Sequence, residues 1–362
     1  MSGESYDLHL TTLSPIHIGS GKSYRCCEFV PAKDKLNGND TKIIKRVDLT
    51  NYYSSLSDDK KDNFLAGLTN SNFKLEQFDK KIKKDFVRYQ CIDNSHDSFK
   101  NVQEHIKTSD KLYIPGSSIK GAIRTAIFYD LLTEDDMDNI GRDIFSNPFL
   151  SDDLLKKHFS SGFGNDAQNN IFRFMQVADT TTTNLPKIEQ VLIIMASNGQ
   201  RKNKSYSIKS NIKSYLETIG ANKKFKSRLT TTFDSNIYRK LKLEDKSEIL
   251  NLNYLKDVLF KFSQDLIYYE MDFADKYDID YLSKFYENLN KKNTVDAPLL
   301  KIGAGSGLMA TSIAMKLKEY NPLSFERVRK SFNRRNYEFE FPKSRKVTKQ
   351  KKPFGWVKLE FN

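Results

Sequence analysis

The first segment with the residue types for phosphate chemistry is Ser14-Pro-Ile-His-Ile-Gly-Ser-Gly-Lys-Ser-Tyr-Arg25, which contains the Gly-Lys-Ser ending of a P-loop. A P-loop also needs a glycine five positions before Gly21, and that position is Ile16. It further needs a helix directly after the serine, so that phosphate meets free N–H groups at the helix start. Residues 24–30 instead have the β-branched and aromatic composition of a strand. The segment is therefore not an ATP site.

His17 is the only histidine beside a glycine loop. Metal-independent RNA cleavage needs a general base near a 2′-hydroxyl, and His17 is the candidate for that role. Lys22 could stabilise the charged intermediate, but no partner is evident for the general acid. The alternatives for His17 are structural support at a strand end and a hydrogen bond to phosphate.

The segment Tyr113-Ile-Pro-Gly-Ser-Ser-Ile-Lys-Gly-Ala-Ile-Arg124 has the features of a phosphate site. Ser117 and Ser118 present hydroxyl and N–H groups at a predicted helix start, where the helix dipole favours an anion. Lys120 and Arg124 are four positions apart and so share one helical face. We predict an RNA phosphate site here. The alternative is an ordinary capped helix with two solvated charges.

A second glycine-rich segment, Gly303-Ala-Gly-Ser-Gly307, lies between a predicted strand and a predicted helix. Its spacing is G-x-G-x-G instead of G-x-G-x-x-G, and too few residues follow for a doubly wound sheet, so we expect no dinucleotide cofactor. Gly303, Gly305, Ser306 and Gly307 would still let an RNA backbone lie against peptide N–H groups. Close packing of helix on sheet would also explain these glycines.

Positive charge is concentrated near the C-terminus. The chain has 59 Lys and Arg against 46 Asp and Glu, a net charge of +13, which predicts an anionic partner such as nucleic acid. Residues 327–352 contain eleven basic residues and two acidic ones, a net charge of +9. Residues 341–352 hold six of the basic residues and no acid, and we expect RNA contacts there, at Lys343, Ser344 and Arg345 among others. A solvated charge run is the alternative.

The elements that would position these segments follow from hydrophobic periodicity. Residues 31–110 are polar and weakly patterned, and we interpret them as a helical insertion. The pattern predicts a hairpin tip or linker at 200–205 and a second unit that opens at about 225. Strands are predicted at 6–13, 111–114, 172–179, 188–195, 225–233, 299–302 and 355–361, and helices at 119–132, 246–271, 280–291 and 308–318. Strands and helices that mix without strict alternation indicate an α+β fold.

The composition narrows the class of protein further. The length of 362 residues suits two domains or one large domain with an insertion. No apolar run is long enough to cross a membrane, and the N-terminus has no signal-peptide pattern. Three cysteines cannot form a disulfide framework, so we expect a cytoplasmic protein. No ligand spacing predicts a metal site. The 25 Phe and 18 Tyr could stack on bases, although core packing is the simpler role for any one of them.

Together these segments resemble the RAMP superfamily of CRISPR proteins. The matching pieces are residues 13–21, 113–124 and 301–307, followed by Pro342-Lys-Ser-Arg345 and Gly355-Trp-Val-Lys358. They are similar in particular to the RAMP subunit that caps the 3′ end of the guide RNA (crRNA) in the type III-A (Csm) effector complex.

The resemblance implies tandem ferredoxin-like (RRM-like) units, which would divide this chain into 1–210, with an insertion at about 31–110, and 211–362, with a helical insertion at about 246–291. It implies a non-catalytic subunit that binds crRNA without sequence preference, caps the backbone filament and supports 3′-end maturation. The implied partners are crRNA, neighbouring Csm backbone RAMP subunits, host ribonucleases and, indirectly, target RNA. His17, Gly19, Ser20, Gly21 and Lys22 would form an RNA- or partner-facing loop. No aromatic stacking motif of the ordinary RRM is evident.

The sequence leaves two other functions open. One is a RAMP endoribonuclease that processes precursor crRNA with His17 as base. The other is a protein-only scaffold of the complex, for which RNA affinity would be negligible.

Overall fold

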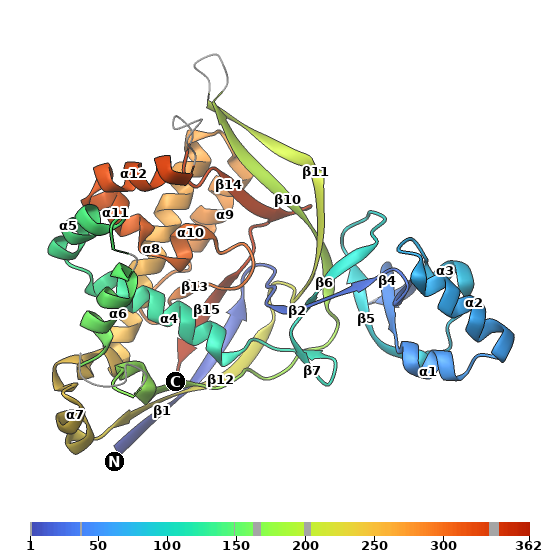
Figure 1. Ribbon diagram of the computed structural model, residues 1–362, viewed down its shortest axis with the longest axis horizontal. Helices are drawn as coiled ribbons and strands as arrows, with labels where there is room; N and C mark the ends of the chain where they lie inside the picture. The colour runs from blue at the N-terminus through green and yellow to red at the C-terminus, as the bar shows by residue number, and fades with distance from the viewer. Residues whose placement is uncertain (1, 37, 148, 162–167, 199–203, 333–339) are drawn as a thin grey trace.

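The computed structural model describes residues 2–36, 38–147, 149–161, 168–198, 204–332 and 340–362. A five-stranded antiparallel sheet lies at its centre, and its strands come from both ends of the chain (Figure 1). Its order is β13 (Leu299–Lys301), β15 (Trp356–Phe361), β1 (Ser2–Thr12), β12 (Lys224–Phe233) and β9 (Met175–Val177).

The central sheet has the connectivity of a ferredoxin-like unit. Helix α4 (Gly116–Leu131) follows β1 and precedes β9, and helix α8 (Leu252–Lys276) follows β12 and precedes β15. The two helices pack against each other and against the sheet. With the strands ordered β15-β1-β12-β9, this is a β-α-β-β-α-β arrangement.

Alternation and helical periodicity explain how these elements form one core. Leu8 and Leu10 on β1 are fully buried, while the residues between and beside them are partly or fully exposed. On α4, Ile119, Ile123 and Ile127 recur at four-residue spacing and are also fully buried. The sheet therefore packs its apolar face against α4 and α8.

A second sheet joins the insertion to the central sheet. Its path is β2-β6-β11-β10-β5-β4-β3, and β14 also pairs with β10. Its strands are β2 (Gly19–Arg25), β3 (Phe29–Leu36), β4 (Asn39–Val47), β5 (Val87–Asp93), β6 (Asn101–His105), β10 (Lys187–Asn198), β11 (Lys204–Thr218) and β14 (Ser344–Thr348). Strands β10, β11 and β14 project together from the body, and we call them the arm (Figure 1).

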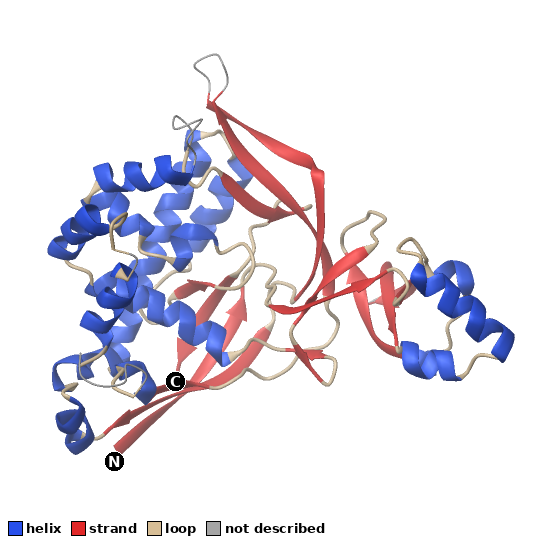
Figure 2. Cartoon of the chain, in the orientation of Figure 1, coloured by secondary structure: helices blue, strands red, loops and turns tan. Residues whose placement is uncertain are grey.

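The remaining elements are mostly helical (Figure 2). A small group lies at one end of the molecule: α1 (Leu49–Ser54), α2 (Asp58–Thr69), α3 (Leu75–Phe78) and η1 (Lys84–Phe86). The other helices gather on the side of α4 and α8: α5 (Glu134–Asp143), α6 (Leu150–Phe159), η2 (Ile171–Phe174), α7 (Ser235–Leu241), η3 (Glu244–Leu250), α9 (Asp280–Asn290), α10 (Gly307–Thr311), α11 (Ala314–Tyr320) and α12 (Pro322–Phe332). A short hairpin, β7 (Lys107–Thr108) with β8 (Lys111–Leu112), precedes α4.

The α+β class predicted from the sequence is confirmed, and several details differ. The insertion at 31–110 contains four of the strands of the second sheet besides its short helices. The expected boundary between 210 and 211 falls inside β11, and the two halves share the central sheet. The predicted strand at 172–179 begins as the turn η2, and the predicted helix at 308–318 is broken into α10 and α11. The tip expected at 200–205 lies mostly outside the described residues.

Among the described residues, no helix has the length and apolar character that crossing a bilayer requires.

Candidate nucleic-acid interface

The two glycine-rich segments found in the sequence meet in the structure. The Ala304 N–H donates to the carbonyl oxygen of His17, at 2.8 Å. Gly303 has a φ of +72°, and a Cβ on it would lie 2.3 Å from that same oxygen. A third segment closes the contact, because the Gly355 N–H donates to the Pro15 carbonyl and a Cβ on Gly355 would lie 2.5 Å from the carbonyl oxygen of Ile302. These glycines are therefore required by close backbone packing.

His17 supports this contact from inside. Its side chain is only 4% exposed, and Nδ1 lies 2.6 Å from the carbonyl oxygen of Glu217, to which it donates. Burial lowers the pKa of His17, so its imidazole is neutral at neutral pH. The sequence placed His17 in an RNA- or partner-facing loop, but its ring is buried against the Glu217 carbonyl and His105 and does not face solvent.

His105 lies beside His17, with ring centroids 5.9 Å apart. Its Nδ1 accepts a hydrogen bond from the Ile18 N–H, and its Nε2 donates to the Tyr113 carbonyl. Complete burial lowers the pKa of His105 to about 3. The sequence placed His105 in a polar segment and gave no signal of this role.

The residues after His17 form the exposed part of the loop. Gly19, Gly21 and Lys22 are exposed, and Ser20 is half-buried with its Oγ accepting a hydrogen bond from the Lys22 N–H. The pairing of β2 with β6 shifts register between Gly19 and Ser23, so this segment bulges out of the sheet. These residues are accessible to solvent, and their contact with RNA or a partner stays a prediction.

The helix after the second glycine segment is not an anion site. Helix α10 has only five residues, and the Ser306 side chain is buried and donates to the Gly303 carbonyl. Gly303 and Gly307 are exposed, whereas Ser306 is turned into the loop. The segment therefore offers exposed backbone and no hydroxyl.

The start of α4 differs more strongly from the expected phosphate site. The helix begins at Gly116 after Pro115, and neither Ser117 nor Ser118 caps it. The Gly116 N–H donates to a carboxylate oxygen of Asp179, so an acidic group of the chain itself occupies this helix end. A Cβ on Gly116 would lie 2.0 Å from the Val177 carbonyl oxygen, which shows how closely the helix approaches β9.

Lys120 and Arg124 do not form one cationic face. The Lys120 Nζ donates to the carbonyl oxygens of Phe172 and Met175, at 2.8 and 2.7 Å, and partial burial lowers its pKa. The sequence predicted a phosphate contact at Lys120, with a solvated charge as the alternative. The structure shows neither, because the Lys120 ammonium is bonded within the chain and joins α4 to η2 and β9. The Arg124 guanidinium is half-buried over the ring of Phe159.

The basic residues of the C-terminal stretch, 327–352, also do not share one surface. Arg345 is buried, bonds Glu270 and stacks on Phe273 at 3.9 Å, and Lys301 lies on the other side of the same carboxylate. Burial disfavours the charged guanidinium of Arg345, but the contact with Glu270 outweighs burial and raises its pKa. Arg345 is thus a structural residue and not the expected RNA contact.

The other members of the stretch have several different environments. Lys343 lies at the start of β14, where its carbonyl accepts from the Ala196 N–H, and Ser344 is exposed. Arg327 donates to the Gly141 carbonyl and Arg329 pairs with Glu326. Arg334 and Arg335 lie outside the described residues.

A cationic row on the arm was not found from the sequence. Cross-strand pairing places Lys209 of β11 and Lys346 of β14 on either side of Ile193 of β10, on one sheet face. Both lysines are exposed. Val191, two residues earlier on that face, is buried in a cluster with Phe354 and Ala304. Lys209 and Lys346 therefore lie on the sheet face that, at Val191, packs against the second glycine segment. Strand register sets this placement.

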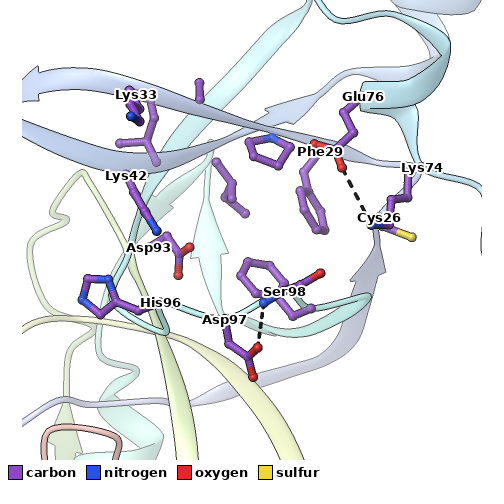
Figure 3. A pocket seen from close by; sticks show the side chains of 15 residues that line it. Cys26, Phe29, Lys33, Lys42, Lys74, Glu76, Asp93, His96, Asp97 and Ser98 are labelled. Carbon is purple, nitrogen blue, oxygen red and sulfur yellow. Dashed lines mark hydrogen bonds and ion pairs between the residues drawn. The ribbon is translucent and has the colours of Figure 1, made fainter.

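A pocket of about 630 Å³ is lined mainly by residues of the insertion (Figure 3). Phe29 and Phe99 contribute apolar walls. Its charged lining residues are Lys33, Lys42, Lys74, Glu76, Asp93 and Asp97. Three cations face three anions, so the pocket has no charge preference for an anionic ligand, and we assign it none. Nor does any group of three or more His, Cys, Asp or Glu side chains in the described parts of the chain form a site for a metal ion.

Comparison with known proteins identifies the family. The model of the RAMP superfamily matches residues 9–310, most of the chain. The chain belongs to the RAMP superfamily. Among curated proteins it is similar to the CRISPR system Cms protein Csm5 of Methanocaldococcus jannaschii, with 22% identity over 397 residues that cover 99% of this chain and 89% of that protein.

Two solved structures share the fold of this chain. One is a chain in the cryo-EM structure of a Csm–crRNA–target RNA ternary complex of a type III-A CRISPR–Cas system, with a TM-score of 0.71, 20% identity and coverage of 98% of this chain and 100% of that one. The other is the crystal structure of T. onnurineus Csm5, with a TM-score of 0.64, 20% identity and coverage of 96% and 99%. The shared fold thus extends over nearly the whole chain.

Proposed function

We propose that this chain is a non-catalytic crRNA-binding subunit of a type III-A CRISPR interference complex, which caps the backbone filament at the crRNA 3′ end. The observation that carries the proposal is the meeting of the two glycine segments at the base of the arm, below Lys209 and Lys346. Exposed peptide groups and separated cations contact phosphates without reading bases. The similarity to Csm5 and to a chain of a Csm–crRNA complex supports the same function.

The proposal includes partners and a biological outcome. The chain would contact neighbouring Csm backbone RAMP subunits and meet target RNA only indirectly, through the guide. It would support 3′-end maturation by shielding the guide and recruiting host ribonucleases. The geometry of His17 favours this function over an endoribonuclease, because a buried ring that donates to the Glu217 carbonyl is poorly placed to reach a 2′-hydroxyl.

RNA binding is tested by fluorescence anisotropy with unrelated single-stranded RNAs over a range of salt concentrations. We expect similar affinity for each sequence and a steep loss of affinity with salt. The double variant Lys209→Ala/Lys346→Ala should reduce the slope of log affinity against log salt by about two, because each phosphate contact contributes roughly one.

The matched control is Lys60→Ala/Lys80→Ala, which removes two exposed lysines from the insertion and should leave the slope unchanged. Equal slopes for the two double variants would refute the arm as the RNA surface. Negligible affinity of the unaltered protein would instead favour the scaffold alternative.

Catalysis is tested with purified protein and labelled precursor crRNA, with and without divalent metal. We expect no cleavage that follows the protein through purification. Cleavage that does so and disappears in His17→Ala would establish the endoribonuclease function instead.

A further inference from the structure

An apolar groove lies on the helical side of the molecule, away from the arm. It has a volume of about 570 Å³ and is formed by α4, α5, α6 and the link between α10 and α11. Its apolar lining includes Phe128, Ile140, Ile144, Leu150, Leu154 and Ile313. A groove of this size and composition accommodates several apolar side chains.

Gly121 opens the groove along α4. A glycine in a helix interior costs about 1 kcal/mol relative to alanine, and such a residue usually allows a close neighbour. A Cβ on Gly121, however, would meet nothing within 4 Å. No described part of the chain uses the space, which is therefore open to a segment from another molecule.

Arg124 places a positive charge in the groove wall. Its guanidinium carbon lies 5.6 Å from the centre of the Phe159 ring, and none of the described residues provides it with a carboxylate partner. A half-buried guanidinium without an acidic partner favours a ligand that carries a carboxylate.

Exposed apolar side chains extend the same surface. Phe149 is 66% exposed and directly precedes Leu150 of the groove. Phe145 is 54% exposed and packs against Arg327 of α12, on which Leu323 is 80% exposed. Exposed large apolar residues around an apolar groove are typical of protein-binding surfaces.

We propose that this groove binds a protein segment in which an acidic side chain lies among large apolar ones. The carboxylate pairs with Arg124, the apolar side chains enter the groove, and the main chain of the segment passes close to Gly121. RNA is a poorer match, because the walls are apolar and a single cation neutralises only one phosphate. The inference rests on the proposed function only for the source of the partner, another protein of the same complex.

The occupant can be identified by site-specific photocrosslinking in the assembled complex. The photoreactive residue p-benzoylphenylalanine replaces Ser151, an exposed residue of the groove, and the chain is co-expressed with the other protein subunits and the guide RNA. After irradiation, mass spectrometry identifies what is attached. We expect a peptide of another protein with an acidic residue within one helical turn of large apolar residues. A crosslink to RNA, a crosslink to a second copy of this chain, or no crosslink would each overturn the proposal.

Two variants test the geometry. Arg124→Glu should lower the crosslink yield about tenfold, because it places a carboxylate opposite a carboxylate. Gly121→Leu should lower the yield similarly by filling the groove, and its melting temperature should not fall, because its Cβ meets nothing. Arg239→Glu, at an exposed position on α7, is the control and should leave the yield unchanged. An unchanged yield in both groove variants would also overturn the proposal.

The guide RNA content of the same preparations separates this inference from the proposed function. A groove variant that loses the crosslink but keeps the normal guide RNA content would show that the groove binds the partner independently of RNA binding. A complex that assembles without guide contact to this chain would refute the RNA-binding function and leave the groove proposal standing.

Discussion

Lys120 and Arg124 are four positions apart on α4, yet only Lys120 is tied to the rest of the fold. Its Nζ reaches two carbonyl oxygens about fifty residues further along the chain, and Arg124 contacts one aromatic ring and open space. Local spacing is visible in the sequence, but the elements packed against a helix are not.

Lys120→Met should therefore lower the free energy of unfolding by about 1–2 kcal/mol, because two carbonyl oxygens lose a charged donor. Arg124→Met should change it by less than about 0.5 kcal/mol, since it resembles a surface substitution. Urea unfolding of both variants checks the contrast. Equal stability of the two would mean that the Lys120 contacts contribute nothing.

His105 gives a pH dependence whose sign follows from its environment. Its pKa is about 3 in the folded chain, against about 6.5 in the unfolded chain. Between these values the unfolded chain binds a proton that the folded chain does not, so this contribution to stability is complete above pH 6.5 and is lost as the pH falls. The loss should approach roughly 1.4 kcal/mol per pH unit below pH 6.

Urea unfolding at pH 7.5 and pH 5.5 measures this effect, and His105→Asn should reduce the difference between the two pH values by about 1 kcal/mol. His17 also has a lowered pKa and should account for part of the dependence that remains. An identical pH dependence in His105→Asn would contradict the assignment.

At the scale of elements, alanine substitutions at three glycines distinguish the cost of a left-handed backbone from the cost of close packing. Gly303 combines a φ of +72° with a Cβ position 2.3 Å from the His17 carbonyl oxygen, Gly307 has a φ of +77° with open space, and Gly121 is helical with open space. Alanine should cost more than about 3 kcal/mol at Gly303 and about 1–2 kcal/mol at Gly307. It should stabilise by up to about 1 kcal/mol at Gly121.

Thermal unfolding of the three variants should reproduce that order. Gly303→Ala should also weaken RNA binding, because it separates the two glycine segments. A Gly303 variant as stable as the Gly307 variant would show that the loops do not depend on this contact.

The same elements show how far the sequence predicts this fold. The spacing of Ile119, Ile123 and Ile127 predicts α4, and the alternation of Leu8 and Leu10 predicts β1. Strands β3 and β4 were missed because their outer residues are polar and largely exposed. In the site, both glycine segments were found from composition, but their contact depends on the pairing of β1 with β15. Lys209 and Lys346 were not singled out together because only sheet register brings them to one face.

At the scale of the whole molecule, the first and last strands are neighbours. β15 lies between β1 and β13, and the Asp7 and Asn362 backbones exchange two hydrogen bonds. Removal of residues 354–362 should abolish the cooperative unfolding transition, because Trp356, Val357 and Leu359 are fully buried. Addition of nine Gly and Ser residues after Asn362, which is exposed, should leave the transition intact. Circular dichroism melts of both forms check this, and a cooperative melt of the shortened chain would contradict it.

The position of β15 also has a consequence for biosynthesis. The segment that completes the central sheet, and that brings Gly355 against Pro15, is synthesised after every other strand of that sheet. Until then β1 has one unpaired edge and the glycine segments lack their third partner. A chain that stops before β15 would lack this contact, so the proposed RNA surface is complete only once β15 has been made.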